Sequence, residues 1–244
     1  IVNDAKANDI LWVNSAGNMS DQNHWEGSFR DTNGDTAHEF AIGDASSWGS
    51  IIIGGPAYDD DGNEVDGEAG VVLRWDDWLG RTIDYDLILY DYGTQNIVDY
   101  SYYTQDGSLP PVEYVQVDVP ASETYHVYYF VVIRNSIATP SVDFEVFAVG
   151  RCYLQDYYTA SSAITEPADA VGALAVGAIS KDNWQNGPQE PYSSRGPTNA
   201  WAGSAARTKP DICGSDNVNT YIYGSYLSYP KDTLEKTLNI IAQL

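Results

Sequence analysis

The chain has 244 residues, enough for one large domain or two smaller ones, each with a core of its own. Its formal net charge of -23, from 35 acidic and 12 basic residues, argues against nucleic acid and anionic membrane surfaces as partners. The 19 tyrosines and 7 tryptophans are unlike the composition of disordered acidic chains, so the sequence predicts a folded protein.

No apolar run approaches the roughly 20 residues that a membrane-spanning helix needs, so we expect no membrane insertion. The two cysteines, Cys152 and Cys213, are too few for a disulfide scaffold. One bridge between them and two free thiols fit the sequence equally well.

Along the chain, residues 1–18 read as a helix followed by a strand at 10–15. Residues 25–150 alternate aromatic and polar positions between clusters of Gly, Pro, Asn and Asp. This pattern predicts several short antiparallel strands in a jelly-roll-like β-sandwich. We interpret "WDDW", residues 75–78, as an edge of that sandwich.

From about residue 160 small residues become frequent. The run "PADAVGALAVGAIS" is typical of a buried parallel strand, which we expect at 173–178. Residues 229–244 predict a helical tail capped by Asp232. A helix and a strand at 1–18 are too short to be a domain and need this downstream segment as partner. The predicted fold class is therefore α/β: a parallel sheet with helices, interrupted by the antiparallel sandwich.

Four segments carry a family resemblance. "VNSAGN", which ends at Asn18, is followed in order by "PADAVGALAVGAI", "PYSSRGPT" and "KPDICG". Together they resemble the catalytic domain of subtilisin-like serine proteases, some of which carry a β-sandwich insertion after this asparagine. The resemblance implies a partial subtilisin-like catalytic domain at 1–24 and 151–228, with the inserted domain at 25–150.

The resemblance implies that Asn18 is the oxyanion-hole residue of a serine endopeptidase. A side-chain amide fixed at a strand end can donate to the oxygen that becomes negative as the tetrahedral intermediate forms. Ser15, Ala16 and Gly17 would then lie beside the substrate. Taken without its context, Asn18 reads better as a turn residue than as an oxyanion-hole residue.

The same alignment implies a cis Glu166–Pro167 bond along the specificity pocket, with Thr165 at the pocket base. A branched hydroxyl there would narrow the pocket and disfavour large aromatic substrate side chains. The alternative is an ordinary trans proline in a surface loop, since only about 5–6% of X–Pro bonds are cis.

The family's catalytic histidine and serine motifs, H-G-T-H and G-T-S-x-A-x-P, do not occur in the sequence. We interpret His24, His38 and His126 as structural residues, and Ser225 and Ser228 lack the small neighbours that the nucleophile needs. The chain alone is therefore expected to be inactive. Its expected partners are the remainder of the catalytic domain and a peptide or protein substrate, in a secreted or cell-surface setting.

An acidic loop, "DTNGDTAHE", places Asp31, Asn33, Asp35 and Glu39 at spacings that suit a calcium ion. Solvated turns select the same residues, so the spacing also fits a hairpin loop. A second loop, with Asp59, Asp61, Asn63 and Asp66, follows a similar pattern. No cofactor other than this calcium is expected.

A different class of function competes with the protease. The protease-like segments would then be a catalytically dead scaffold that presents the sandwich as a carbohydrate- or protein-binding module. Aromatic residues along strands are also the ordinary content of a β-sheet core.

Overall fold

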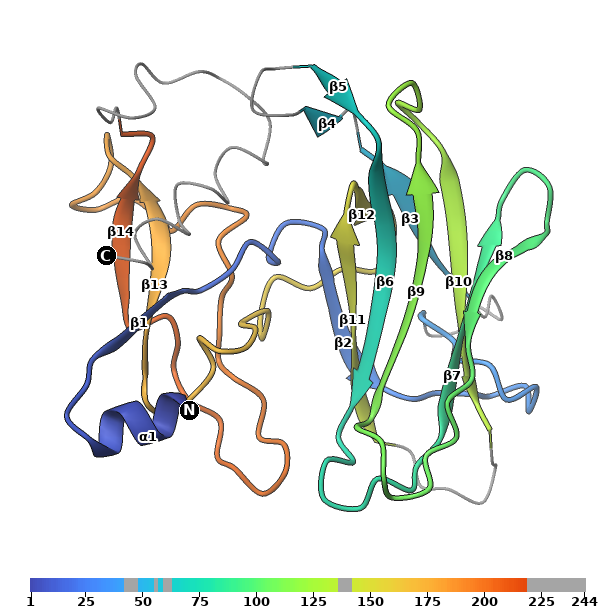
Figure 1. The fold of residues 1–244 in the computed structure, drawn as a ribbon, viewed down its shortest axis with the longest axis horizontal. Coiled ribbons are helices and arrows are strands. Elements are labelled where there is room, and N and C mark those ends of the chain that lie inside the picture. Colours follow the sequence, from blue (N-terminus) through green and yellow to red (C-terminus); the bar gives the residue numbers. More distant parts are fainter. Residues whose placement is uncertain (42–47, 55–56, 59–62, 136–141, 219–244) are drawn as a thin grey trace. The chain divides into compact units, whose positions relative to one another are not determined.

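The computed structural model describes residues 1–41, 48–54, 57–58, 63–135 and 142–218, drawn in Figure 1. These residues form two compact units, and their boundaries fall at 21/22 and 159/160, where the sequence predicted 24/25 and 150/151. A short stretch, 201–204, also belongs to the second unit. The predicted tail at 229–244 lies outside the described residues, as do Ser225 and Ser228.

The first unit is built on a small parallel sheet. It contains a helix of 6 residues, α1 (Val2–Ala7), and the strands β1 (Trp12–Ser15), β13 (Ala173–Ser180) and β14 (Ile212–Asp216). The sheet order is β1-β13-β14, and both pairings are parallel, with Trp12 opposite Ala173. The prediction that the strands at 10–15 and 173–178 lie side by side is confirmed.

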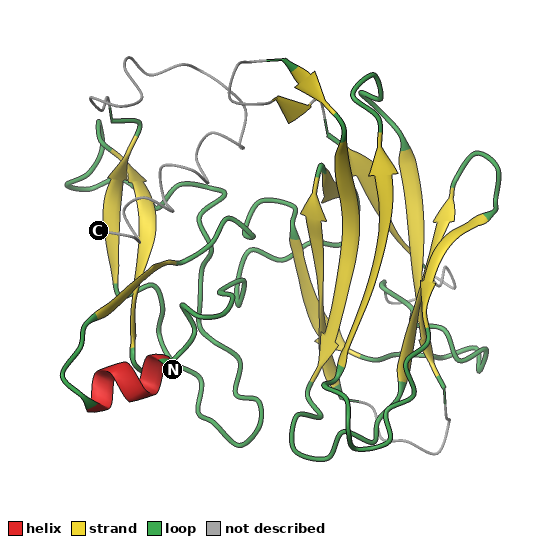
Figure 2. Cartoon of the chain, in the orientation of Figure 1, coloured by secondary structure: helices red, strands yellow, loops and turns green. Residues whose placement is uncertain are grey.

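The predicted α/β fold class is wrong. Strands dominate the described residues, and α1 is the one helix among them, as the colouring of Figure 2 shows. The segments 160–172 and 181–211, which connect the parallel strands, form turns and extended chain in place of helices. Both are rich in Pro, Gly and Ser, which oppose helix formation.

The second unit is a pair of antiparallel sheets, as expected for its alternating sequence. One sheet has the order β12-β3-β10-β7-β8 and the other has the order β2-β11-β6-β9. A separate two-stranded ribbon pairs β4 with β5. The strands are β2 (His24–Ser28), β3 (Gly49–Ile53), β4 (Ala57–Tyr58), β5 (Glu64–Val65), β6 (Gly67–Trp75), β7 (Tyr85–Asp91), β8 (Ile97–Ser101), β9 (Val112–Val119), β10 (Val127–Arg134), β11 (Asp143–Gly150) and β12 (Cys152–Leu154).

Alternate residues of these strands form one apolar core, because successive side chains of a strand point to opposite faces. The largest fully buried members are Trp75, Tyr85, Phe130 and Phe144. Trp75 ends β6, an inner strand of its sheet, so the interpretation of "WDDW" as a sandwich edge is wrong for this residue.

Both cysteines are free thiols, Cys152 buried and Cys213 exposed. Burial raises the pKa of Cys152 to about 12, which keeps this thiol protonated and unreactive. Among the described residues, no helix has the length and apolar character to cross a membrane.

Candidate functional site

The chain turns sharply where β1 ends. The Ala16 N–H donates to the Val176 carbonyl at 2.8 Å, so pairing with β13 continues one residue past the strand. Gly17 then has a φ of +99°, a conformation that other residues rarely adopt. A Cβ at this position would lie 3.0 Å from Ser194 Oγ and 3.3 Å from Thr165 Oγ1. Both the backbone conformation and the space therefore require glycine before Asn18.

Ser194 fixes the chain on both sides of Asn18. Its main-chain N–H donates to the Gly17 carbonyl at 2.8 Å, and its Oγ accepts the Met19 N–H at 2.9 Å. Ser194 is fully buried, and Gln189 Nε2 donates to its carbonyl at 2.9 Å. No role was predicted for this serine, because nothing local in "PYSSRGPT" indicates that it contacts a turn far upstream.

The Asn18 side chain is half-buried and makes no hydrogen bond with any residue that the structure describes. Its Oδ1 is enclosed and has no hydrogen-bond partner among the described residues. An enclosed acceptor without a partner costs about 1–3 kcal/mol, so this one calls for an explanation. The main chain on both sides of Asn18 is held in place, while its side-chain amide bonds to no described residue.

The other residues assigned to the substrate site fall around this turn. Ala16 is buried in a small cluster with Ile164, Ala168 and Ala175, which joins the turn to the segment before β13. Ser15 and Thr165 are half-buried, whereas Glu166 is exposed. The Glu166–Pro167 bond is cis, as predicted. The structure thus brings Gly17 and Thr165 together and turns the Glu166 side chain to solvent.

The three histidines belong to the second unit and have other partners. His126 Nε2 lies 2.6 Å from Asp91 Oδ2. His38 is buried among aromatic rings, and burial, reinforced by Arg30, lowers its pKa to about 3. Within the described residues, none of the three contacts a serine hydroxyl, in agreement with their interpretation as structural residues.

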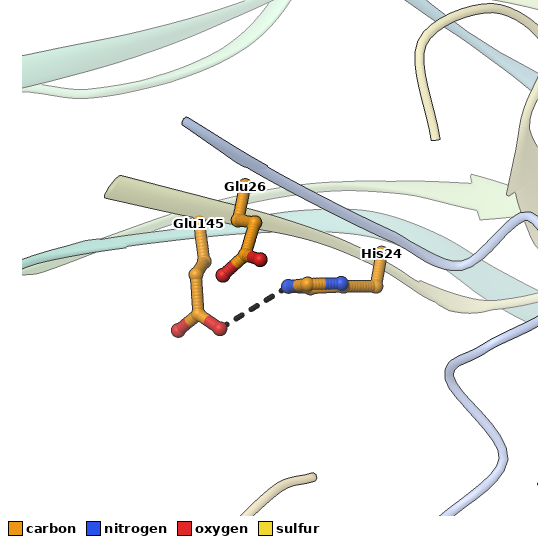
Figure 3. A group of neighbouring side chains, drawn as sticks. All are labelled: His24, Glu26 and Glu145. Carbon is orange, nitrogen blue, oxygen red and sulfur yellow. Dashed lines mark hydrogen bonds and ion pairs between the residues drawn. The ribbon is translucent and has the colours of Figure 1, made fainter. Parts of the chain in front are cut away.

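His24, Glu26 and Glu145 form a group whose ligand atoms all lie within 4.8 Å of one another, as Figure 3 shows. His24 and Glu145 are fully buried, and His24 Nε2 lies 3.1 Å from Glu145 Oε1. Arg74 Nε lies 2.5 Å from the other oxygen of Glu145. Because the chain's own cation already neutralises Glu145, we interpret this group as an internal charge network and not as a metal centre.

The predicted calcium loop uses its oxygens internally. Asp31 accepts two main-chain N–H groups, at 2.7 and 3.1 Å. Asp35 accepts one main-chain N–H at 2.9 Å and the Asn33 amide at 3.0 Å. Glu39 is buried and accepts the Thr32 N–H at 2.9 Å. These are the bonds of a self-contained turn, and calcium at this loop stays a prediction. In the second acidic loop, Asp59 and Asp61 lie outside the described residues.

We expect Glu39→Gln to lower the melting temperature at pH 7. Hydrogen bonds from the Thr32 hydroxyl, and then from its main-chain N–H, lower the pKa of Glu39. A lowered pKa in the folded state means stability that is present above the unfolded value of about 4.3 and is lost as pH falls through the folded value. The effect should therefore shrink in melts recorded at acidic pH.

Glu64 supplies the control, since Glu64→Gln removes the same charge from an exposed site. An equal effect of both variants at pH 7 would rule out a specific role for Glu39. Melts of the parent chain in millimolar calcium test the ion directly, because an ion that binds only the folded state raises the melting temperature.

One of the solved structures similar to this chain is a protease. The Clostridium perfringens CspB protease matches with a TM-score of 0.54 at 14% identity, over 91% of this chain and 46% of that protease. The chain therefore spans about half the length of the protease and shares the fold of that part. At this identity the likeness establishes a protease-related fold alone.

A second structure, the Yersinia pseudotuberculosis-derived mitogen, matches with a TM-score of 0.28 at 14% identity, over 52% of this chain and 82% of that one. A score this low does not indicate a common fold. No family model matches the sequence, and no curated protein matches it.

Proposed function

We propose that the chain is a segment of a subtilisin-like serine endopeptidase in which Asn18 is the oxyanion-hole donor. The observation that carries the proposal is the position of Asn18. Its neighbours Gly17 and Met19 are both bonded to Ser194, and its side-chain amide bonds to no described residue. The likeness of fold to a protease supports it. The four sequence segments that resemble the family, in the same order, support it further.

In this proposal the chain acts on charge that develops during the reaction. When a serine attacks the scissile carbonyl, the carbonyl oxygen becomes negative, and the Asn18 Nδ2–H group donates a hydrogen bond to it. The bond strengthens as charge grows, so it lowers the barrier more than it strengthens substrate binding. Gly17 leaves room for the substrate main chain, and Ser194 positions the amide.

Ser15, Ala16 and Gly17 would form one wall of the primary specificity pocket, and Thr165, Glu166 and Pro167 the other. Thr165 sits against Gly17, so its branched side chain would shorten the pocket. We infer a preference for small substrate side chains over large aromatic ones. The catalytic triad would come from the remainder of the catalytic domain, in a secreted or cell-surface protease.

An active-site-directed fluorophosphonate tests the proposal, because an activated catalytic serine attacks its phosphorus, displaces fluoride and becomes phosphonylated, whereas ordinary serines react poorly. We expect the protease that contains this segment to be labelled at one serine and the chain alone to remain unlabelled. Heat-denatured protease is the control for non-specific reaction. Absence of labelling and of peptide hydrolysis in the intact protein would contradict the proposal and favour a catalytically dead scaffold.

A further inference from the structure

The second unit carries an acidic residue on an otherwise apolar sheet face. Tyr85, Leu87 and Leu89 of β7 point into the core, so the alternate residues Asp86, Ile88 and Tyr90 lie on the opposite face. Register extends this face over the neighbouring strands β10 and β8, because Tyr129 lies opposite Tyr90 and Tyr100 lies opposite Ile88. Figure 1 shows these three strands.

Asp86 has no hydrogen-bond or ion-pair partner among the described residues. It is 8% exposed, its Oδ1 is enclosed, and neither carboxylate oxygen accepts a hydrogen bond from a described residue. A buried carboxylate without donors is costly, and it is a reason to look for a missing ligand.

No basic side chain of the unit serves Asp86. The described arginines of this unit have other partners: Arg30 with Glu39, Arg74 with Glu145, Arg134 with Asp31, Arg81 with the Trp78 carbonyl and Arg151 with the Val119 carbonyl. The nearest charge that acts on Asp86 is a second carboxylate, Asp84, two residues earlier. The face therefore presents uncompensated negative charge.

Tyrosine rings lie on the same face as this carboxylate. Tyr100 and Tyr102 stack at 4.6 Å and are 59% and 47% exposed. Tyr90 and Tyr129 stack at 4.8 Å beside them. Burial raises the pKa of Tyr102, and Tyr90, Asp86 and Tyr100 raise it further, so its hydroxyl lies within electrostatic range of the Asp86 carboxylate.

We propose that this face, formed by Asp86 with Tyr90, Tyr100 and Tyr102, binds the cationic side chain of a lysine or arginine in a peptide or protein partner. A carboxylate supplies the opposite charge, and tyrosine rings attract cations through their π faces. The proposal is independent of the protease function.

A bare metal ion fits this face less well than an alkylammonium or guanidinium group. Asp84 Oδ1 accepts the Gln105 N–H at 3.3 Å and Asp84 Oδ2 accepts the Asn135 amide at 2.9 Å, so both oxygens of Asp84 already serve the chain. Asp86 is then the one carboxylate available, whereas a hard cation needs about six oxygen ligands.

Binding should depend on the charge of Asp86. Burial, with a smaller effect of Asp84, raises the pKa of Asp86 to about 6. Glu113 also lies within electrostatic range of Asp86, and burial raises its pKa to about 7. Because a cation binds the ionised carboxylate, affinity should be highest above pH 7 and should fall as pH decreases through about 6.

The test uses the whole chain and three capped tripeptides with lysine, arginine or norleucine in the middle, with binding followed by NMR shifts of the tyrosine rings. We expect the lysine and arginine peptides to bind and the uncharged norleucine peptide to bind at least about tenfold more weakly. Asp86→Asn should weaken binding of the charged peptides by a similar factor and remove its pH dependence. Asp118→Asn, on an exposed position of β9, removes the same charge elsewhere and should leave binding unchanged.

Thermal melts of each variant separate lost binding from lost structure. Asp86→Asn removes a charge that the folded state disfavours, so this variant should melt no earlier than the parent at pH 8. If the charged peptides bind Asp86→Asn and Asp118→Asn equally well, the binding is a general attraction to an acidic surface, and the proposal is overturned. Binding of an uncharged oligosaccharide to the same tyrosines, without binding of basic peptides, would overturn it in favour of a carbohydrate site.

Discussion

Replacing Asn18 with alanine is expected to lower kcat of the proposed protease by about 10²–10³ and to leave KM nearly unchanged; this magnitude is the one known for the same loss in subtilisin. The reason is that the Asn18 amide would meet full negative charge only in the transition state. Gly17 and Met19 remain bonded to Ser194 in the variant, so the turn should keep its shape. Steady-state hydrolysis of a peptide substrate measures both constants.

Asn14→Ala is the matched control, because Asn14 lies four residues earlier in β1 and its amide donates to the Ser15 carbonyl at 2.9 Å. We expect this variant to change kcat by only a few-fold. A kcat loss of the same size in both variants would indicate a damaged β1 and not a missing oxyanion donor. A raised KM at constant kcat for Asn18→Ala would assign the amide to ground-state binding.

The sequence predicted the strand neighbours better than the fold class. A run of small apolar residues at 173–178 favours a buried strand, and β1 is the parallel partner that its order in the chain implies. The prediction of helices was wrong because it rested on the family resemblance. Pro and Gly in the connecting segments oppose helix formation. The residue composition of these segments was therefore a better guide to their secondary structure than the resemblance.

The site was predictable where it is continuous in sequence and not where it is assembled by the fold. Gly17 and Asn18 stand together in "SAGN", and their positions follow from the end of β1. Ser194 reaches the same turn from the far end of the chain, and no spacing rule indicates that contact. The calcium prediction had a different limit, because Asp and Asn at these spacings occur in ordinary turns and in calcium loops. Only the hydrogen-bond partners of their oxygens distinguish the two.

Asp86 shows the same limit on the second unit. In "YDLILYD" the alternation places residue 86 opposite the core, where a carboxylate would ordinarily meet water. In the structure Asp86 is buried, and Tyr102, which lies beyond the end of β8, is within electrostatic range of it. The alternation predicts that Asp86 is exposed, whereas the structure buries it. This difference, which marks Asp86 as a candidate site residue, becomes visible only in the folded structure.

Trp75→Ala is expected to lower the free energy of unfolding of the second unit by about 3–5 kcal/mol. Trp75 is fully buried, packs edge-on against Tyr85 at 5.4 Å, and donates its Nε1–H to the Ile83 carbonyl at 2.9 Å. The variant would leave a large cavity and an acceptor without its donor, and both effects destabilise the core. Denaturant-induced unfolding of the whole chain, followed by circular dichroism, measures the loss.

Two further variants divide this effect into its parts. Trp75→Phe keeps most of the buried ring but loses the N–H donor, so its cost should be smaller, about 1–3 kcal/mol. Tyr125→Ala removes an aromatic ring that is 64% exposed in the same unit and should change stability by no more than about 0.5 kcal/mol. If Trp75→Ala costs no more than Tyr125→Ala, then Trp75 does not belong to the core. The loss in free energy of unfolding should therefore be largest for Trp75→Ala and smallest for Tyr125→Ala. Buried apolar area and a satisfied hydrogen-bond donor stabilise the unit, and an exposed aromatic ring contributes little.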